Sequence, residues 1–195
     1  SSIDSTNARA KELAQGGAVH GTLVIAEEQT SGRGRLGRSW VSPAGMGIWM
    51  SLILRPSFLP RNASRVTVIT ALAVTDAIDK ITGLTADIKW PNDIIINSRK
   101  VCGILTEIQA DPDTIEYLVV GIGLNVNTPR DAFPEELSQS ASSLFMESGV
   151  KVERNILLAG ILDSFERIYN KYEETESFTA IMDDYKAQCI TSNKR

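Results

Sequence analysis

Four strand-like segments follow one another closely in the middle of the sequence. They are rich in Ile, Val and Leu and cover residues 86–90, 94–96, 101–108 and 115–126. Turn-forming residues stand in the three connections, among them Pro91, Asn97 and Asp111. Connections this short leave no room for a crossover helix, so neighbouring strands must run antiparallel. The sequence therefore restricts the chain to folds built around an antiparallel sheet.

Helix-favouring segments surround these strands. We expect helices over residues 6–15, 63–81, 152–172 and 178–185, and further strands over residues 22–27 and 48–54. Apolar side chains recur at helical spacing in the second helix, which is typical of a helix packed on a sheet. Residues 129–143 predict a loop with one turn of helix. The expected fold class is α+β, with a mixed, mainly antiparallel sheet and helices packed on one face.

Length and charge limit the function classes. The 195 residues fit a single domain. Lys and Arg number 20 against 24 for Asp and Glu, so the net charge of −4 gives no electrostatic reason to expect DNA binding. No apolar stretch approaches the roughly 20 residues of a membrane helix. Cys102 and Cys189 lack CxxC spacing, which argues against a disulfide framework or a zinc site. We therefore expect a reduced, cytoplasmic protein.

The most unusual segment, residues 32–40, interleaves three glycines with three arginines and spells GxGxxG. In dinucleotide-binding folds these glycines open a helix, and an acidic residue follows about 20 positions later. Pro43, Gly45 and Gly47 forbid that helix, and no acidic residue stands at that distance. A kinase interpretation fails because HRD-like and DFG motifs are absent. Two interpretations remain open: a cationic loop that closes over an anion, and a solvated basic turn.

Two further segments favour the ligand-binding interpretation. Residues 89–93, KWPND, place a cation, an aromatic ring, an amide and a carboxylate at a strand end. Lys100 precedes the apolar segment 101–105, where its ammonium could reach a ligand or extend along the surface. His20 is the only histidine, so most His-based catalytic motifs are excluded. Any chemistry must rest on Arg, Lys, Asp, Asn, Gln and backbone groups.

Taken together and in this order, five segments resemble the catalytic domain of biotin protein ligases, also called biotin:acetyl-CoA carboxylase ligases. The segments are Ser5-Thr6-Asn7, Gln29 to Trp40, Lys89 to Asp93, Lys100 to Leu105 and Gly121 to Asn127. The resemblance covers nearly the whole chain. It implies a fold shared with lipoate ligases and, more distantly, with class II aminoacyl-tRNA synthetases.

The resemblance also implies an activity. The family joins the carboxyl group of biotin to AMP from MgATP and then passes the biotinyl group to a lysine of a biotin carboxyl carrier domain, in acetyl-CoA carboxylase or a related carboxylase. One rival is a lipoate or octanoate ligase on the same fold, and Gln29 with the arginine loop favours biotin over it. Another rival is a biotin-binding sensor, against which Asp93 and Lys100 argue.

Roles follow from the resemblance residue by residue. It implies catalytic roles for Lys100, Arg35 and Asp93. Biotin contacts are implied for Ser5, Thr6, Asn7, Gln29, Gly32, Arg33, Arg35, Lys100, Gly121 and Gly123. ATP contacts are implied for Arg33, Arg35, Arg38, Trp40, Asn92, Lys100 and Asn125. Alternatives stay open: Ser5 could be only a helix cap, the glycines could mark a β-bulge, and Asp93 could take a proton or help hold Mg²⁺. No metal ligand is assigned.

Partners and domain limits are expected on the same basis. We expect the catalytic domain over residues 1–188 and the start of a small SH3-like domain over residues 189–195. The carrier domain is the expected protein partner, and a homodimer paired through sheet edges is a hypothesis. The sequence contains no helix-turn-helix of the kind that lets some family members act as repressors.

Overall fold

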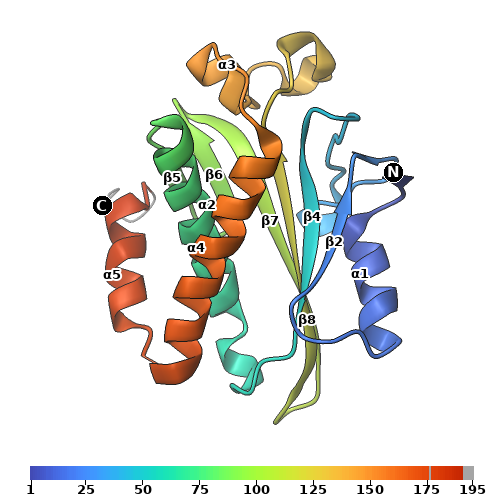
Figure 1. Ribbon diagram of the computed structural model, residues 1–195, viewed down its shortest axis with the longest axis vertical. Helices are drawn as coiled ribbons and strands as arrows, with labels where there is room; N and C mark the ends of the chain where they lie inside the picture. Colours follow the sequence, from blue (N-terminus) through green and yellow to red (C-terminus); the bar gives the residue numbers. More distant parts are fainter. Residues whose placement is uncertain (176, 191–195) are drawn as a thin grey trace.

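The central sheet has six strands in the order β2-β4-β8-β7-β6-β5, and every neighbouring pair is antiparallel. The computed structural model describes residues 1–175 and 177–190 (Figure 1). The strands are β2 (Thr22–Ala26), β4 (Gly47–Leu54), β5 (Asp87–Lys89), β6 (Asp93–Ile96), β7 (Arg99–Ala110) and β8 (Ile115–Asn125). Two short strands, β1 (Ser2–Ile3) and β3 (Glu28–Gln29), form a separate parallel pair. The predicted antiparallel sheet is confirmed.

Three long helices cover one face of the sheet, as Figure 1 shows: α2 (Ser64–Thr82), α4 (Arg154–Thr175) and α5 (Thr179–Gln188). They enclose the main apolar core, to which β4 contributes Ile48, Met50 and Leu54. This arrangement confirms the helices expected on one face, and each begins and ends within a few residues of its predicted bounds.

Helix α1 (Thr6–Gln15), whose bounds agree with the prediction, lies on the opposite face of the sheet, where no helix was expected. Its Ala10 and Ala14 are buried against Ile53 of β4 and against Tyr117 and Val119 of β8. Alternate residues of a strand point to opposite faces, so β4 supplies both cores. The side chains that form the site described below lie on this second face, beside the start of α1.

Short elements were also absent from the sequence-based expectation. The segment 129–143 contains two 3₁₀ turns, Arg130–Ala132 and Glu135–Leu137, where one turn was expected. Helix α3 (Leu144–Ser148) follows it. Ser143 caps α3 by accepting a hydrogen bond from Met146 N, and Gly149 ends it at a φ of 75°. These two residues mark the ends of a five-residue helix that is too short to show an amphipathic period.

Near the end of the described chain, Cys189 forms a parallel bridge to Ile88 of β5. The amide of Ile190 donates to the Ile88 carbonyl at 3.2 Å. These contacts join the end of α5 to the edge strand β5. Residues 191–195, where the start of a further domain was expected, lie outside the described residues.

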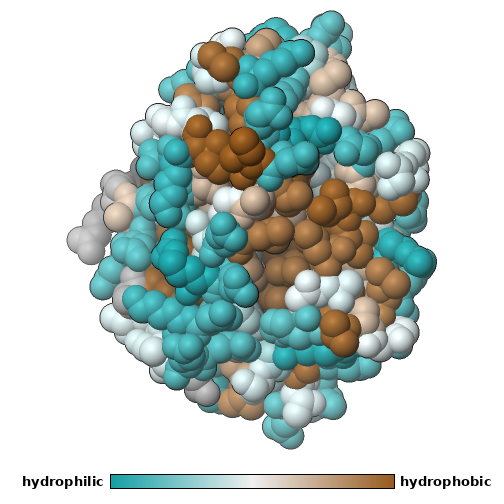
Figure 2. Space-filling model, viewed as in Figure 1, coloured by the Kyte–Doolittle hydropathy of each residue, from teal (hydrophilic) through white to brown (hydrophobic). Residues whose placement is uncertain are grey.

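The helices leave part of the sheet uncovered. Figure 2 shows apolar side chains gathered on this open area, beside α4 and over the region of β2 and β4. Leu23 and Leu52 are partly buried there against the main core, and Ile25 on the same side of β2 is 45% exposed. Across the described residues, we found no helix with both the length and the hydropathy to span a bilayer.

Candidate functional site

The arginine loop of residues 32–40 is held at its base by backbone hydrogen bonds. Trp40 N donates to Gly32 O at 2.9 Å, and Gly34 N donates to Arg38 O at 2.7 Å. Gly32 is buried there, and a Cβ at this position would lie 2.4 Å from Trp40 O. Gly32 therefore shapes the loop but does not line the cavity that the loop covers. Arg33 and Arg35, further along the loop, do line it.

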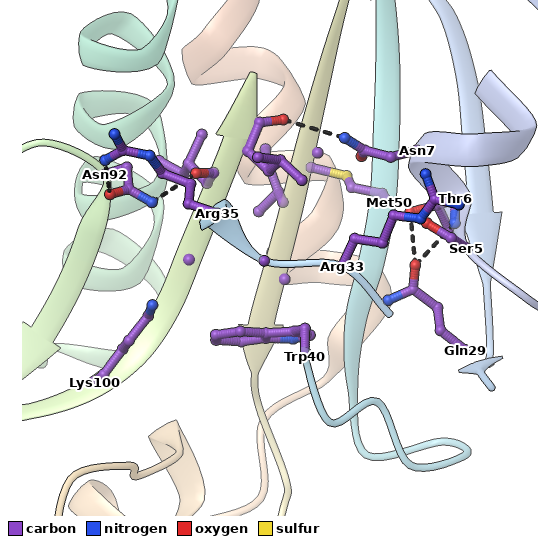
Figure 3. Close-up of a pocket in the computed structure, with 17 residues that line it drawn as sticks. Ser5, Thr6, Asn7, Gln29, Arg33, Arg35, Trp40, Met50, Asn92 and Lys100 are labelled. Atoms are coloured by element: carbon purple, nitrogen blue, oxygen red, sulfur yellow. Dashed lines mark hydrogen bonds between the residues drawn. The ribbon is translucent and has the colours of Figure 1, made fainter. Parts of the chain in front are cut away.

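Below the loop lies a central cavity, lined by most of the residues predicted to bind biotin (Figure 3). At its polar end, Gln29 Oε1 accepts hydrogen bonds from Thr6 N at 2.8 Å and Thr6 Oγ1 at 3.0 Å. Gln29 Nε2 donates to Ser42 Oγ at 2.8 Å. These contacts fix which end of the Gln29 amide points toward Thr6. The Ser5 hydroxyl accepts from Ala8 N and caps α1, so its expected capping role is confirmed.

Glycines form the floor of this cavity. Gly103 of β7 lies opposite Gly123 of β8, and Gly121 lies opposite Ser51 of β4. A Cβ on Gly123 would lie 2.4 Å from Trp40 Nε1, and a Cβ on Gly121 would lie 2.0 Å from Asn7 Oδ1. Both glycines face the same side of β8, and their missing side chains make room for Trp40 and Asn7.

Trp40 lies flat across the strands on this glycine floor (Figure 3). Lys100 Nζ lies 5.1 Å from the centroid of its ring, within the range of a cation–π contact. The indole Nε1 is buried and has no hydrogen-bond partner in the described part of the chain. It is therefore a donor still available to a ligand that enters the cavity.

Two polar pairs stand at the other end of the cavity. Lys100 Nζ lies 2.7 Å from Asp93 Oδ1, and both side chains are about one-third exposed or less. One guanidinium nitrogen of Arg35 donates to Asn92 Oδ1 at 2.9 Å. Asn92 Nδ2 in turn donates to the Ile104 carbonyl at 2.9 Å. The loop and the β5–β6 turn are therefore joined directly above the sheet.

A second hollow, here called the side hollow, opens on the far side of Lys100. It has a volume of about 470 Å³ and combines Arg38, Asp93 and Asn125 with the apolar Phe133 and Leu137. Asn125 is buried and donates to Ser142 O at 3.0 Å. Six of the seven residues predicted for ATP meet here, because Arg35, Trp40, Asn92 and Lys100 line both this hollow and the central cavity, and Arg38 and Asn125 line this hollow. Arg33 lines the central cavity only.

A third hollow, here called the outer groove, was not predicted. Its volume is about 500 Å³, and its walls include Val68, Trp90 and Phe178 together with the cation Arg65. Arg35 and Asn92 border this groove as well as the other two hollows. These two side chains therefore stand at the junction of all three.

Several lining residues were missed by sequence reasoning. Gly103 carried a signal, since glycine inside a strand often marks close approach of another group. The buried Ser51, which contacts Thr6 and Asn7 but does not itself line the cavity, carried another, since it is a polar residue within an apolar strand pattern. Phe133 and Leu137 carried none, because their place in the side hollow depends on how residues 129–143 fold back over Lys100. Lys100 N donates to Ser140 O at 2.8 Å in that contact.

Charges near the site have clear physical causes. Burial on its own would raise the pKa of Glu107, but hydrogen bonds from Asn7 and Lys11 and the positive charges of Lys11 and Arg33 outweigh it and lower that pKa. Burial raises the pKa of the Cys102 thiol, which therefore stays neutral beneath the site. Among the described residues, no cluster of three or more His, Cys, Asp and Glu could hold a metal ion.

Solved biotin protein ligases share this fold. The biotin protein ligase of Aquifex aeolicus, solved in complex with biotin and ATP, superposes with a TM-score of 0.85 at 33% identity, over 97% of this chain and 76% of that one. The Leishmania major enzyme, solved with biotinyl-5-AMP, gives 0.77 at 26% identity, over 100% and 81%.

The sequence comparisons agree. The model of the Biotin/lipoate A/B protein ligase family matches residues 1–125, and the chain belongs to this family. A bifunctional ligase/repressor BirA of Bacillus spizizenii is 48% identical over 92% of this chain and 55% of its own length. A biotin–[acetyl-CoA-carboxylase] ligase of Mycobacterium tuberculosis is 33% identical over 98% and 70%. The chain spans about half the length of the BirA relatives it matches.

Proposed function

We propose that this chain is the catalytic part of an ATP-dependent biotin ligase. It activates biotin as biotinyl-5′-AMP and transfers the biotinyl group to a lysine of a biotin carboxyl carrier domain, in acetyl-CoA carboxylase or a related carboxylase. The observation that carries the proposal is the position of Arg35 and Lys100, which border both the central cavity and the side hollow. Names of relatives and of ligand-bound neighbours support the same reaction.

The first step must bring two anions together. A carboxylate oxygen of biotin attacks the α-phosphorus of ATP, an acyl–phosphate bond forms, and the bond to pyrophosphate breaks. Cations at the point of attack offset the repulsion and stabilise the charge that develops. Lys100 and Arg35 are placed for this role, with Arg33 on the biotin side and Arg38 on the triphosphate side.

The remaining contacts follow from the two hollows. We assign Ser5, Thr6, Asn7 and Gln29 to the ureido end of biotin, above the floor of Gly121 and Gly123. Trp40 and Asn92 are assigned to the adenine side, and Asn125 to the phosphate side. Gly32 is assigned an indirect role, since it holds the base of the loop and does not line the cavity.

In the second step, the lysine amine of the acceptor attacks the acyl carbon and AMP leaves. The acceptor amine must lose a proton. Asp93 lies 2.7 Å from Lys100, the residue assigned to the acyl phosphate. We therefore assign to Asp93 the role of accepting the proton of the acceptor amine. Mg²⁺ usually binds through one or two protein oxygens together with substrate phosphates and water. The side hollow, which offers few carboxylate ligands in the described part of the chain, therefore fits this ion. Asp93 and Asn125 are the residues that would hold it, and it would neutralise charge on the triphosphate.

Further partners belong to the same proposal. We propose that the enzyme acts in the cytoplasm and that two copies pair through sheet edges. Light scattering at micromolar concentration tests the pairing, and a monomeric mass would reject it.

We also propose that this part of the enzyme does not bind DNA. Titration of labelled duplex DNA at low salt tests this, and saturable binding would reject it.

Pyrophosphate release measured with ATP and Mg²⁺ tests the activity. Biotin, lipoate and octanoate are offered separately, without an acceptor. Release with biotin alone is the expected result, and it would identify reaction and substrate together. Release with lipoate or octanoate but not with biotin would overturn the assignment of the ureido end. Calorimetric titration of biotin then separates a pocket that binds without turnover from one that does not bind.

A further inference from the structure

A carboxylate outside the central cavity holds one of the cavity's polar residues in place. Glu107 lies on β7, is not among the residues that line the cavity, and has a side chain 29% exposed. Its Oε2 accepts a hydrogen bond from Asn7 Nδ2 at 2.9 Å, and its Oε1 lies 3.0 Å from Lys11 Nζ. The Leu105 carbonyl also accepts from Asn7 Nδ2, at 3.3 Å. Both partners of that nitrogen are therefore acceptors.

This arrangement fixes the orientation of the Asn7 amide. A carboxylate and a carbonyl can only accept, so Nδ2 must face β7 and Oδ1 must face the other way. Asn7 Oδ1 accepts a hydrogen bond from Ser51 Oγ at 2.6 Å, and it occupies the space left by the missing side chain of Gly121. Asn7 is 4% exposed, so a reversed amide would set Oδ1 against the Glu107 carboxylate and the Leu105 carbonyl, acceptor against acceptor, in a dry environment.

The orientation extends further through hydrogen bonds. Ser51 Oγ also lies 2.8 Å from Thr6 Oγ1, and Thr6 is bonded to Gln29 Oε1. Ser51 has one hydroxyl proton, which cannot bond fully to Asn7 Oδ1 and to Thr6 Oγ1 at once, so oxygen atoms with free lone pairs remain at this end of the cavity. Such an end suits a ligand that brings N–H donors, as the cyclic urea of biotin does. Lipoate and octanoate bring none.

We propose that Glu107 is a positioning residue that sets acid selectivity by holding Asn7 as a hydrogen-bond acceptor. The proposal rests on the proposed function. Glu107 does not touch the ligand, and it acts through the Asn7 side chain. Lys11 anchors the other carboxylate oxygen to α1, so the helix that carries Thr6 and Asn7 is tied to β7 at the same point.

The test compares Glu107→Gln with the wild-type chain. An amide has one acceptor oxygen where the carboxylate has two, so it cannot serve Lys11 and Asn7 equally. We expect the Kd for biotin, measured by calorimetry, to rise about tenfold, within the range for one poorly satisfied buried polar group. The KM for ATP should change less than twofold. The preference for biotin over lipoate should fall by the same factor as biotin binding.

Two matched variants separate positioning from a general structural effect. Glu116→Gln makes the same chemical change at an exposed position of the neighbouring strand β8, and it should leave the biotin Kd unchanged. In an Asn7→Ala background, Glu107→Gln should have no further effect on the biotin Kd, because the residue through which it acts is gone.

Three results would overturn the proposal. The first is an unchanged biotin Kd in Glu107→Gln. The second is a full additional loss when Glu107→Gln is placed in the Asn7→Ala background. The third is a wild-type chain that binds no biotin, which would reject the proposed function as well. If the wild type and Glu107→Gln both bind biotin with the same Kd, only the role of Glu107 is rejected and the proposed function stands.

Discussion

At the scale of single residues, the ion pair between Lys100 and Asp93 determines what an incoming carboxylate has to do. The ammonium already has an anionic partner at 2.7 Å, so a substrate carboxylate must share it or displace Asp93. The side chains are partly exposed, which makes such an exchange inexpensive in solvation terms. Lys100 also lies over Trp40, so the same cation contacts groups on both sides of the reacting centre.

Replacing this cation tests its role. We expect Lys100→Met to lower biotin-dependent pyrophosphate release by about 10²–10³-fold, the usual effect of losing one preorganised group that stabilises a transition state. The midpoint of thermal unfolding should change little, because the lost ion pair is partly exposed. Lys151→Met, at an exposed position, is the control and should retain full activity. A Lys100→Met variant that keeps more than a tenth of the activity would contradict the assignment.

Single residues also show where sequence reasoning succeeds and where it fails. Lys100, Arg35 and Gly121 stand in the compact motifs that carry the family resemblance, and the structure brings all three to the central cavity. Glu107 had no such motif, and the polar type of Ser51 within an apolar strand marks the position without indicating its partner. Each acts through Asn7, which lies 44 positions from Ser51 and 100 positions from Glu107. No local pattern carries information about a partner that only the fold brings near.

At the scale of elements, the arginine loop is a cover joined to the rest of the site through few contacts. One is the hydrogen bond from Arg35 to Asn92. We expect Arg35→Gly to release biotinyl-5′-AMP early, because the loop would no longer shield the acyl phosphate. Gel filtration of the enzyme after one round of adenylation, followed by measurement of the retained intermediate, checks this. Arg61→Gly, at an exposed turn before α2, is the control, and equal retention in both variants would argue against the role of the loop.

Helices α2 and α4 are joined by Asp76, whose Oδ2 accepts from Ser164 Oγ at 2.5 Å and from an Arg167 guanidinium nitrogen at 3.0 Å. Burial would raise the pKa of Asp76, but hydrogen bonds from Lys80 and Ser164 and the charges of Lys80 and Arg167 lower it below 3.8. A lowered folded-state pKa contributes stability that is complete above the ordinary pKa and is lost as the pH falls through the lowered value.

Stability measured against pH therefore tests this connection. We expect Asp76→Asn to unfold at a lower temperature than the wild type at pH 7, with the difference shrinking as the pH falls below about 4. Asp79→Asn, an exposed neighbour on the same helix, should show no such difference. A gap between Asp76→Asn and the wild type that stays constant from pH 3 to pH 7 would show that the charge of Asp76 is not its source.

The elements themselves were predictable to different degrees. The long helices and central strands have a clear hydrophobic period, and their bounds agree with the structure within a few residues. Helix α3 and strand β1 have too few residues to show any period. They depend on contacts made after the chain has folded, such as the hydrogen bond from Phe145 N to Val126 O at 2.8 Å.

At the scale of the whole molecule, the main core and the catalytic surface share one sheet. Ile104 and Ile122 belong to the main core and also border the central cavity. The order of the strands could not be predicted, because β4 pairs with β8 and not with the next strand in sequence. Long-range pairing of this kind depends on which apolar faces pack together and not on any local signal.

Core packing should therefore govern the stability of the entire unit. We expect Ile161→Ala, at a fully buried position of α4, to cost about 2–5 kcal/mol of unfolding free energy through lost contacts and a cavity. Ile156→Ala makes the identical change on the same helix at a side chain that is 60% exposed, and it should cost less than about 0.5 kcal/mol. Urea unfolding measures both, and similar midpoints for the two variants would contradict a core at Ile161.

Arg35 and Asn92 border the central cavity, the side hollow and the outer groove alike. This shared border constrains how the protein can evolve under pressure from an inhibitor. A compound that bridges any two of the hollows has to pass these two side chains. Under the proposed function, a substitution that escapes the compound there would also disturb the binding of biotin and ATP. Resistance at this junction should therefore carry a fitness cost, whereas compounds confined to a single hollow leave cheaper routes of escape.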